Sequence, residues 1–218
     1  MGRSFMFRAP LHDTVSCWPF REGTGSTVHD VFSGLNGTIY GTPAWATSEG
    51  IRALDLEASS ATDRVDMGDQ SELDFGTGEF TIAGWFLAES LPGSAMSMLA
   101  KGSPDLSGYA LAIHATNTLR FLYGATVTAG TTTLSTATWY HGAIVRDASS
   151  DLRLYLNGSL DNTPVNYTGP FSVSDAFIMG RWSHDPSAYF DGMFSAWRVY
   201  DRGLSAEEIA YLATLRRI

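Results

Sequence analysis

The stretch TWYHGAIVRDASSDLRLYLNGSLD, residues 138–161, decides the fold class. In its second half Leu152, Leu154 and Leu156 alternate with other residues, so the three leucines would point to one face of a strand. Asn157-Gly158 follows directly, and this dipeptide is a strong hairpin signal because both positions of the tight turn need positive φ. The stretch therefore predicts an antiparallel β-hairpin.

Further strand patterns run along the rest of the chain. FTIAGWFLAE is apolar at nearly every position, which predicts a central strand covered on both faces. The remaining patterns lie at 109–114, 118–124, 177–182 and 192–200. Short strands at this spacing, with turn residues between them and no linker, predict one all-β domain, a two-sheet antiparallel jelly-roll sandwich.

One short helix is expected near the C-terminus. Ser205 is a good N-cap, and Glu208 three residues later completes a capping box. Leu204 and Ile209 are placed to form a hydrophobic staple around this start. Ile209 and Leu212 then give an apolar stripe that can lie on the sandwich.

Composition excludes several classes of protein. The net charge of −9 over 218 residues argues against nucleic acid and anionic lipid as partners. No apolar run is long enough for membrane insertion, and Cys17, the single cysteine, cannot form a disulfide within the chain. The N-terminus has no signal-peptide pattern, so we expect synthesis in the cytoplasm without a signal peptide. Residues 1–10 would form an edge strand or an arm that pairs with a neighbouring subunit.

Five sequence blocks, in order, resemble the laminin G-like jelly-roll domains of the concanavalin A-like lectin and glucanase superfamily. They are CWPFREGTGSTVHDVFSGLNGTIYG, ALDLEASSATDRVDMGD, FTIAGWF, the opening stretch 138–161, and YFDGMFSAWRVYDRGLSAEEIAYL. The resemblance covers about residues 13–213. It implies one laminin G-like domain over 11–218, with 1–10 as the arm or edge strand.

The resemblance also implies a binding function. Domains of this family are usually non-catalytic, bind sugars or proteins, and often hold calcium. Their closing strand carries a Gly-x-Ile-Asp-Glu-Val pattern, which here reads Gly-Met-Phe-Ser-Ala-Trp from Gly192. Ser195 stands where related calcium-binding members carry an acidic ligand, so the resemblance implies that calcium binding is weakened or lost.

The loop DVFSGLNG, residues 30–37, is the candidate calcium site. Calcium takes six to eight oxygen ligands, and Asp30, Ser33 and Asn36 offer side-chain oxygens on a glycine-rich turn. The alternative is plain turn chemistry, because Asp, Ser, Gly and Asn all stabilise turns without a metal. Asp191 is interpreted as a structural residue that orients the turn into the last strand.

A candidate sugar site lies in the segment GRWSHDPSAYFDG. Aromatic faces stack on the apolar faces of sugars, and this segment brings Trp182 and Tyr189 together with the polar residues His184 and Asp185. Trp45, in GTPAWATS, is a possible neighbour. The alternative is that Trp182 and Tyr189 close the edge of the core.

Catalysis has little support in the sequence. Glucanases of the superfamily carry two carboxylates on one strand in a Glu-x-Asp-x-Glu or Glu-x-Asp-x-x-Glu run, and this chain has only the fragment Asp55-Leu56-Glu57. No nucleophile elbow or zinc-protease motif occurs, and His141 alternates with apolar residues as a packed histidine would. We therefore predict that the protein is not an enzyme.

The expected setting is a bacteriophage virion. A binding domain with no signal peptide suits a capsid or tail decoration on the virion surface, with other virion proteins or copies of itself as partners, and a trimer is plausible. One alternative is a free lectin or adhesin module that binds a cell-surface glycan. A second alternative is a degenerate glycoside hydrolase. The fold alone does not choose among these.

Overall fold

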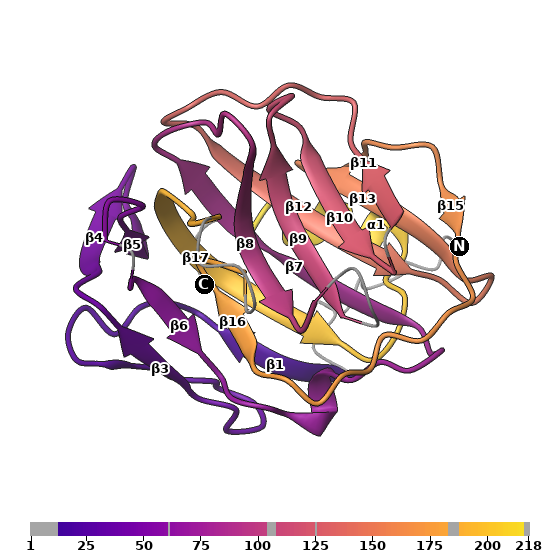
Figure 1. The fold of residues 1–218 in the computed structure, drawn as a ribbon, viewed down its shortest axis with the longest axis horizontal. Helices are drawn as coiled ribbons and strands as arrows, with labels where there is room; N and C mark the ends of the chain where they lie inside the picture. The colour runs from indigo at the N-terminus through magenta and orange to yellow at the C-terminus, as the bar shows by residue number, and fades with distance from the viewer. Residues whose placement is uncertain (1–12, 61, 104–107, 125, 183–187, 216–218) are drawn as a thin grey trace, which may run out of the picture.

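The computed structural model describes residues 13–60, 62–103, 108–124, 126–182 and 188–215. They form two antiparallel sheets that pack face to face, as Figure 1 shows with β8, β9 and β10 in front of β7, β12 and β13. This is the predicted sandwich. The predicted arm at 1–10 lies outside the described residues.

The first sheet has nine strands in the order β14-β13-β12-β7-β17-β5-β4, with β1 added beside β17 and β15 beside β13. Its strands are β1 (Thr14–Trp18), β4 (Ala44–Ser48), β5 (Ile51–Leu56), β7 (Phe80–Ala88), β12 (Trp139–Arg146), β13 (Asp151–Leu156), β14 (Ser159–Leu160), β15 (Val165–Asn166) and β17 (Gly192–Tyr200).

The second sheet has eight strands in the order β11-β10-β9-β8-β16-β6-β3-β2. Its strands are β2 (Thr27–Val28), β3 (Gly37–Tyr40), β6 (Arg64–Asp66), β8 (Ala95–Lys101), β9 (Tyr109–His114), β10 (Leu119–Tyr123), β11 (Thr126–Ala129) and β16 (Phe177–Met179). A short 3₁₀ turn, η1 (Ser71–Leu73), precedes β7.

The strand β7 lies at the centre of the first sheet, between β12 and β17. All nine of its residues are buried, which confirms the prediction from its apolar sequence. Phe80, Ile82 and Phe86 face the second sheet in the main core, whereas Ala83 and Trp85 belong to apolar clusters on the outer face. The outer face of this sheet is therefore partly apolar and needs its own cover.

The helix α1 (Ala206–Leu212) supplies part of that cover, behind the first sheet in Figure 1. It begins with the predicted capping box, in which the Ser205 hydroxyl and the Glu208 carboxylate each accept a backbone N–H. Its residues Ile209 and Leu212 pack with Leu204 against the outer cluster. No described helix is long and apolar enough to cross a membrane.

The hairpin that decides the fold is formed as its sequence indicates. Leu156 pairs with Ser159, and the two residues between them, Asn157 and Gly158, have φ of 50° and 83°. A side chain at Gly158 would also meet the backbone of Ala210 in α1 at 2.9 Å. Glycine at this position therefore serves both the turn and the close approach of the helix.

A bulge in β17 shapes the sheet where β1 joins it. The pairing with β7 shifts between Ser195 and Arg198, and Ala196 has a φ of 50° and donates its N–H to the Pro19 carbonyl at 3.3 Å. Trp197 turns into the core across Gly84, where a Cβ would collide with the indole ring. The bulge leaves Ala196 and Arg198 lining a pocket beside β1.

Candidate ligand-binding site

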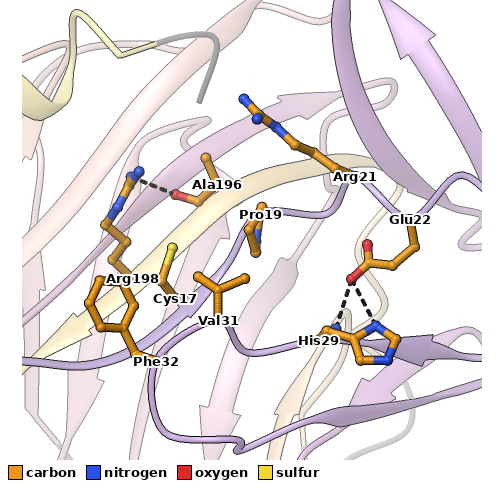
Figure 2. Close-up of a pocket in the computed structure, with 9 residues that line it drawn as sticks. All are labelled: Cys17, Pro19, Arg21, Glu22, His29, Val31, Phe32, Ala196 and Arg198. Atoms are coloured by element: carbon orange, nitrogen blue, oxygen red, sulfur yellow. Dashed lines mark hydrogen bonds and ion pairs between the residues drawn. The ribbon is translucent and has the colours of Figure 1, made fainter.

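A pocket of about 480 Å³ lies where β1 and β17 meet the loop that follows β2. Figure 2 shows its floor of Cys17, Pro19 and Ala196, with Val31 and Phe32 from the loop beside them. Its walls are mostly apolar, and the charged side chains are Arg21, Glu22, His29 and Arg198. An apolar hollow with a few polar groups is the usual form of a small-ligand site.

The loop places two apolar side chains in solvent at the rim. Val31 and Phe32 are 60% and 48% exposed, and they are adjacent in the chain. Val31 donates its N–H to the Cys17 carbonyl at 3.0 Å, so the loop is fixed to the free edge of β1. Exposed neighbouring apolar residues on a fixed loop are typical of a contact surface.

The carboxylate of Asp30 organises this loop. Burial alone would raise the pKa of Asp30, but hydrogen bonds hold it below its usual value. Its Oδ1 accepts the backbone N–H groups of Cys17 at 2.8 Å and Phe32 at 3.0 Å, and its Oδ2 accepts bonds from Ser16, Ser33 and Leu35. The rim of the pocket is therefore held by one side chain.

The three candidate calcium ligands do lie together, but they bond to each other. The Ser33 hydroxyl donates to Asp30 at 2.5 Å, and Asn36 Oδ1 accepts the Asp30 N–H at 2.9 Å. A calcium ion would have to displace donors from oxygens that are already satisfied. Ser195 bonds elsewhere, from its Oγ to the Arg52 carbonyl at 2.8 Å. This geometry favours the turn interpretation.

Two charged side chains at the pocket have unused bonding capacity. Glu22 Oε1 accepts the His29 N–H at 2.7 Å, while its buried Oε2 has no partner among the described residues. Arg198 is only 5% exposed and donates from Nη1 to the Ala196 carbonyl at 3.2 Å. The described part of the chain provides Arg198 with no carboxylate partner.

A second, smaller pocket of about 280 Å³ adjoins the first, because Glu22 lines both. Trp45 stands in this second pocket with Arg52, and its indole N–H donates to the Gly25 carbonyl at 3.2 Å. Trp45 was predicted as a sugar-binding residue, and its partly exposed side chain lines this pocket together with Glu22.

The other predicted sugar-binding residues are only partly placed. Trp182 and Tyr189 are partly exposed, and His184 and Asp185 lie outside the described residues. Where the structure is described, no ring contact joins Trp45 to Trp182 or Tyr189. The predicted grouping of Trp45 with the 182–189 segment therefore stays a prediction.

Asp191 has a different bonding pattern from the one expected. Its Oδ1 accepts the N–H of Ala58 at 3.1 Å, and its backbone carbonyl accepts the N–H of Glu89 at 2.9 Å. These bonds tie the start of β17 to the exits of β5 and β7. Asp191 thus links distant segments where a local Asx turn was expected, and its structural role stays a prediction.

An acidic cluster lies at the same end of the first sheet. Oxygens of Asp55, Glu57 and Glu89 lie within 4.8 Å of one another. Burial, together with the charges of Glu89 and Glu57, raises the pKa of Asp55 to about 6. The three carboxylates could share a cation, but no second feature of the described structure points to one. Sequence spacing could not reveal the cluster, because Glu89 comes from another strand.

His141 lies on the outer face of β12 and is packed as predicted. It is 1% exposed, and its ring meets Trp85 edge-on with centroids 5.4 Å apart. Burial lowers its pKa to about 3, and the nearby Arg198 contributes in the same direction. A neutral, buried imidazole has no access to a substrate, so it is no candidate for acid–base catalysis.

Two stacked antiparallel sheets with a loop-rimmed pocket define a lectin-like β-sandwich. The family model described as the concanavalin A-like lectin/glucanases superfamily matches residues 59–210, more than half of the chain. The chain belongs to this superfamily. No curated protein sequence matches it.

Solved structures share the fold at low identity. Domain 4 of AbnA, a GH43 extracellular arabinanase from Geobacillus stearothermophilus in complex with arabinotriose, has a TM-score of 0.70 at 18% identity, covering 92% of this chain and 98% of that one. The binding domain of Paraclostridial Mosquitocidal Protein 1 has a TM-score of 0.76 at 14% identity, covering 92% and 52%. Trypanosoma rangeli sialidase has a TM-score of 0.65 at 19% identity, covering 95% and 33%. The chain thus spans about half of the mosquitocidal protein's binding domain and a third of the sialidase.

Proposed function

We propose that this chain is a non-catalytic binding module whose ligand is carbohydrate. The observation that carries the proposal is the pair of adjoining pockets with an aromatic ring in each, Phe32 in one and Trp45 in the other. Aromatic faces stack on sugars, and the shared Glu22 has a buried oxygen that can accept a sugar hydroxyl. The similarity to an arabinanase domain bound to arabinotriose supports the same class of ligand.

An oligosaccharide panel tests this proposal by calorimetry, with arabinotriose as the first member. We expect millimolar to micromolar binding that Phe32→Ala weakens about tenfold, because stacking on an aromatic ring contributes on the order of 1 kcal/mol or more. Val127→Ala, an equally exposed apolar residue on the other sheet, is the matched control and should bind normally. Loss on Trp182→Ala alone would move the site to the 182–189 segment. Failure of the whole panel to bind would overturn the proposal.

The virion remains the proposed setting. It rests on the acidic net charge of −9, with copies of this chain or other virion proteins as partners. Light scattering of the purified protein should give a trimer or larger set that EDTA does not dissociate. A monomer under all conditions would contradict a self-assembling decoration protein and favour the free lectin module.

The degenerate glycoside hydrolase has one observation on its side. Asp55, Glu57 and Glu89 form a close carboxylate group, and the pKa of Asp55 is raised to about 6, as a catalytic acid would require. Burial and the crowding of like charges at the strand ends explain the same shift without catalysis. Turnover of laminarin or agarose that Asp55→Asn abolishes would overturn the non-catalytic proposal.

A further inference from the structure

We infer that the pocket of Figure 2 selects an acidic sugar, whose carboxylate binds Arg198. The inference rests on the proposed carbohydrate-binding function and adds the chemical class of the ligand. It starts from a buried cation, Arg198, that has no counter-ion among the described residues.

Arg198 is buried to 5% exposure, and buried arginines are normally paired with an acid. Its hydrogen bond within the described part of the chain is to a neutral group, because Nη1 donates to the Ala196 carbonyl at 3.2 Å. None of the ion pairs formed by the described residues includes Arg198. A guanidinium has five N–H donors, and the bond to the Ala196 carbonyl engages only Nη1.

The other charges at the pocket favour an anion too. Arg21 is exposed and lines the same pocket, as Figure 2 shows. Glu22, the one carboxylate of the lining, is already engaged through Oε1 with His29. The pocket is thus a cationic spot on a chain of net charge −9, and such local charge concentrates an oppositely charged ligand.

The remaining groups fit a sugar better than a simple anion. Val31 and Phe32 form an apolar wall for a sugar face, and Glu22 Oε2 is a buried acceptor for a hydroxyl. The planar guanidinium matches a carboxylate through two parallel hydrogen bonds. A carboxylate, a hydroxyl and an apolar face occur together in sugar acids.

The test compares trigalacturonate, galactotriose and a sulfated galactotriose in calorimetry at low salt. Trigalacturonate should bind at least about tenfold more tightly than the neutral sugar, because hydrogen bonds to charged groups are the stronger ones. Arg198→Gln should remove that advantage, so that trigalacturonate and galactotriose bind the variant with equal affinity. Arg120→Gln, which removes a cation from β10 of the other sheet, is the matched control and should keep the advantage.

Several results would overturn the inference. They are equal affinity for the acidic and neutral sugars, equal affinity for the sulfated sugar, or an Arg198→Gln variant with unchanged selectivity. If that variant does not fold, Arg198→Lys keeps the charge without the planar fork and should reduce the advantage for trigalacturonate several-fold. Binding of galactotriose alone would contradict this inference but support the carbohydrate-binding function. No binding of any sugar would contradict both.

Discussion

Two acidic regions of this molecule respond to burial in opposite ways. At the pocket rim, the carboxylate of Asp30 is 8% exposed, yet its pKa lies below the usual value. At the end of β5, the more exposed carboxylate of Asp55 has a pKa raised to about 6. Burial raises both values, so the neighbours decide the sign.

The neighbours of Asp30 are donors. Backbone N–H groups of Cys17, Phe32 and Leu35 point at its oxygens, and they favour the charged form. The neighbours of Asp55 are carboxylates, and its buried Oδ1 has no partner among the described residues. One acid therefore stabilises its loop, whereas the other is a source of repulsion that the fold tolerates.

Replacing Asp30 gives the largest expected effect. Asp30→Ala leaves several backbone N–H groups without an acceptor, and each such buried group costs about 1 kcal/mol or more, so we expect a loss of roughly 3 kcal/mol in the free energy of unfolding. The midpoint of urea unfolding measures this loss. Asp30→Asn should be nearly as damaging, since both carboxylate oxygens accept bonds and an amide nitrogen cannot.

The same variant decides between turn and calcium. If Asp30 acts only by stabilising the loop, Asp30→Ala should lower the free energy of unfolding by the same amount in EDTA and in excess calcium. Calcium that stabilises the original protein but not Asp30→Ala would restore the metal interpretation of Asp30, Ser33 and Asn36. Ser33→Ala is a mild control, because it removes one donor and leaves the backbone donors satisfied.

The sequence predicts the local elements of this fold well. Leucine alternation with Asn157-Gly158 predicts the hairpin, and Ser205 with Glu208 predicts the start of α1, because turns and caps depend on residues within a few positions. The predicted strand over 177–182 is shorter in the structure, where β16 ends at Met179 before the positive φ of Gly180.

The candidate site was harder to predict, because it depends on pairings between distant segments. Trp45 was expected at a sugar site. The sequence around it does not indicate that its pocket adjoins the pocket of Phe32, with Glu22 lining both. Arg198 reaches the pocket through a bulge at Ala196, and a positive φ at an alanine has no sequence signal. The acidic cluster of Asp55, Glu57 and Glu89 could not be predicted either, because it also depends on segments that are distant in the sequence.

The smaller expected effect is a gain in the free energy of unfolding, caused by Asp55→Asn. The folded pKa of about 6 lies above the ordinary value of 3.8, so the folded state holds the extra proton. The stability that Asp55 contributes is therefore present below about pH 4 and is lost as the pH rises through 6. At pH 7 the neutral amide should raise the free energy of unfolding by about 1 kcal/mol, after a discount for partial exposure.

The pH dependence of this gain must be measured as a difference between the variant and the original protein. His141 changes the stability in the opposite direction. Its folded pKa of about 3 lies below the ordinary value of 6.5, so stability is lost as the pH falls below 6.5. The difference cancels His141 and should grow from near zero at pH 4 to its full size at pH 7. Glu89→Gln should lower the midpoint of that rise, because its charge helps to raise the pKa of Asp55. A difference that does not vary with pH would mean that the cluster is held by something other than repulsion, and the contrast with Asp30 would fail.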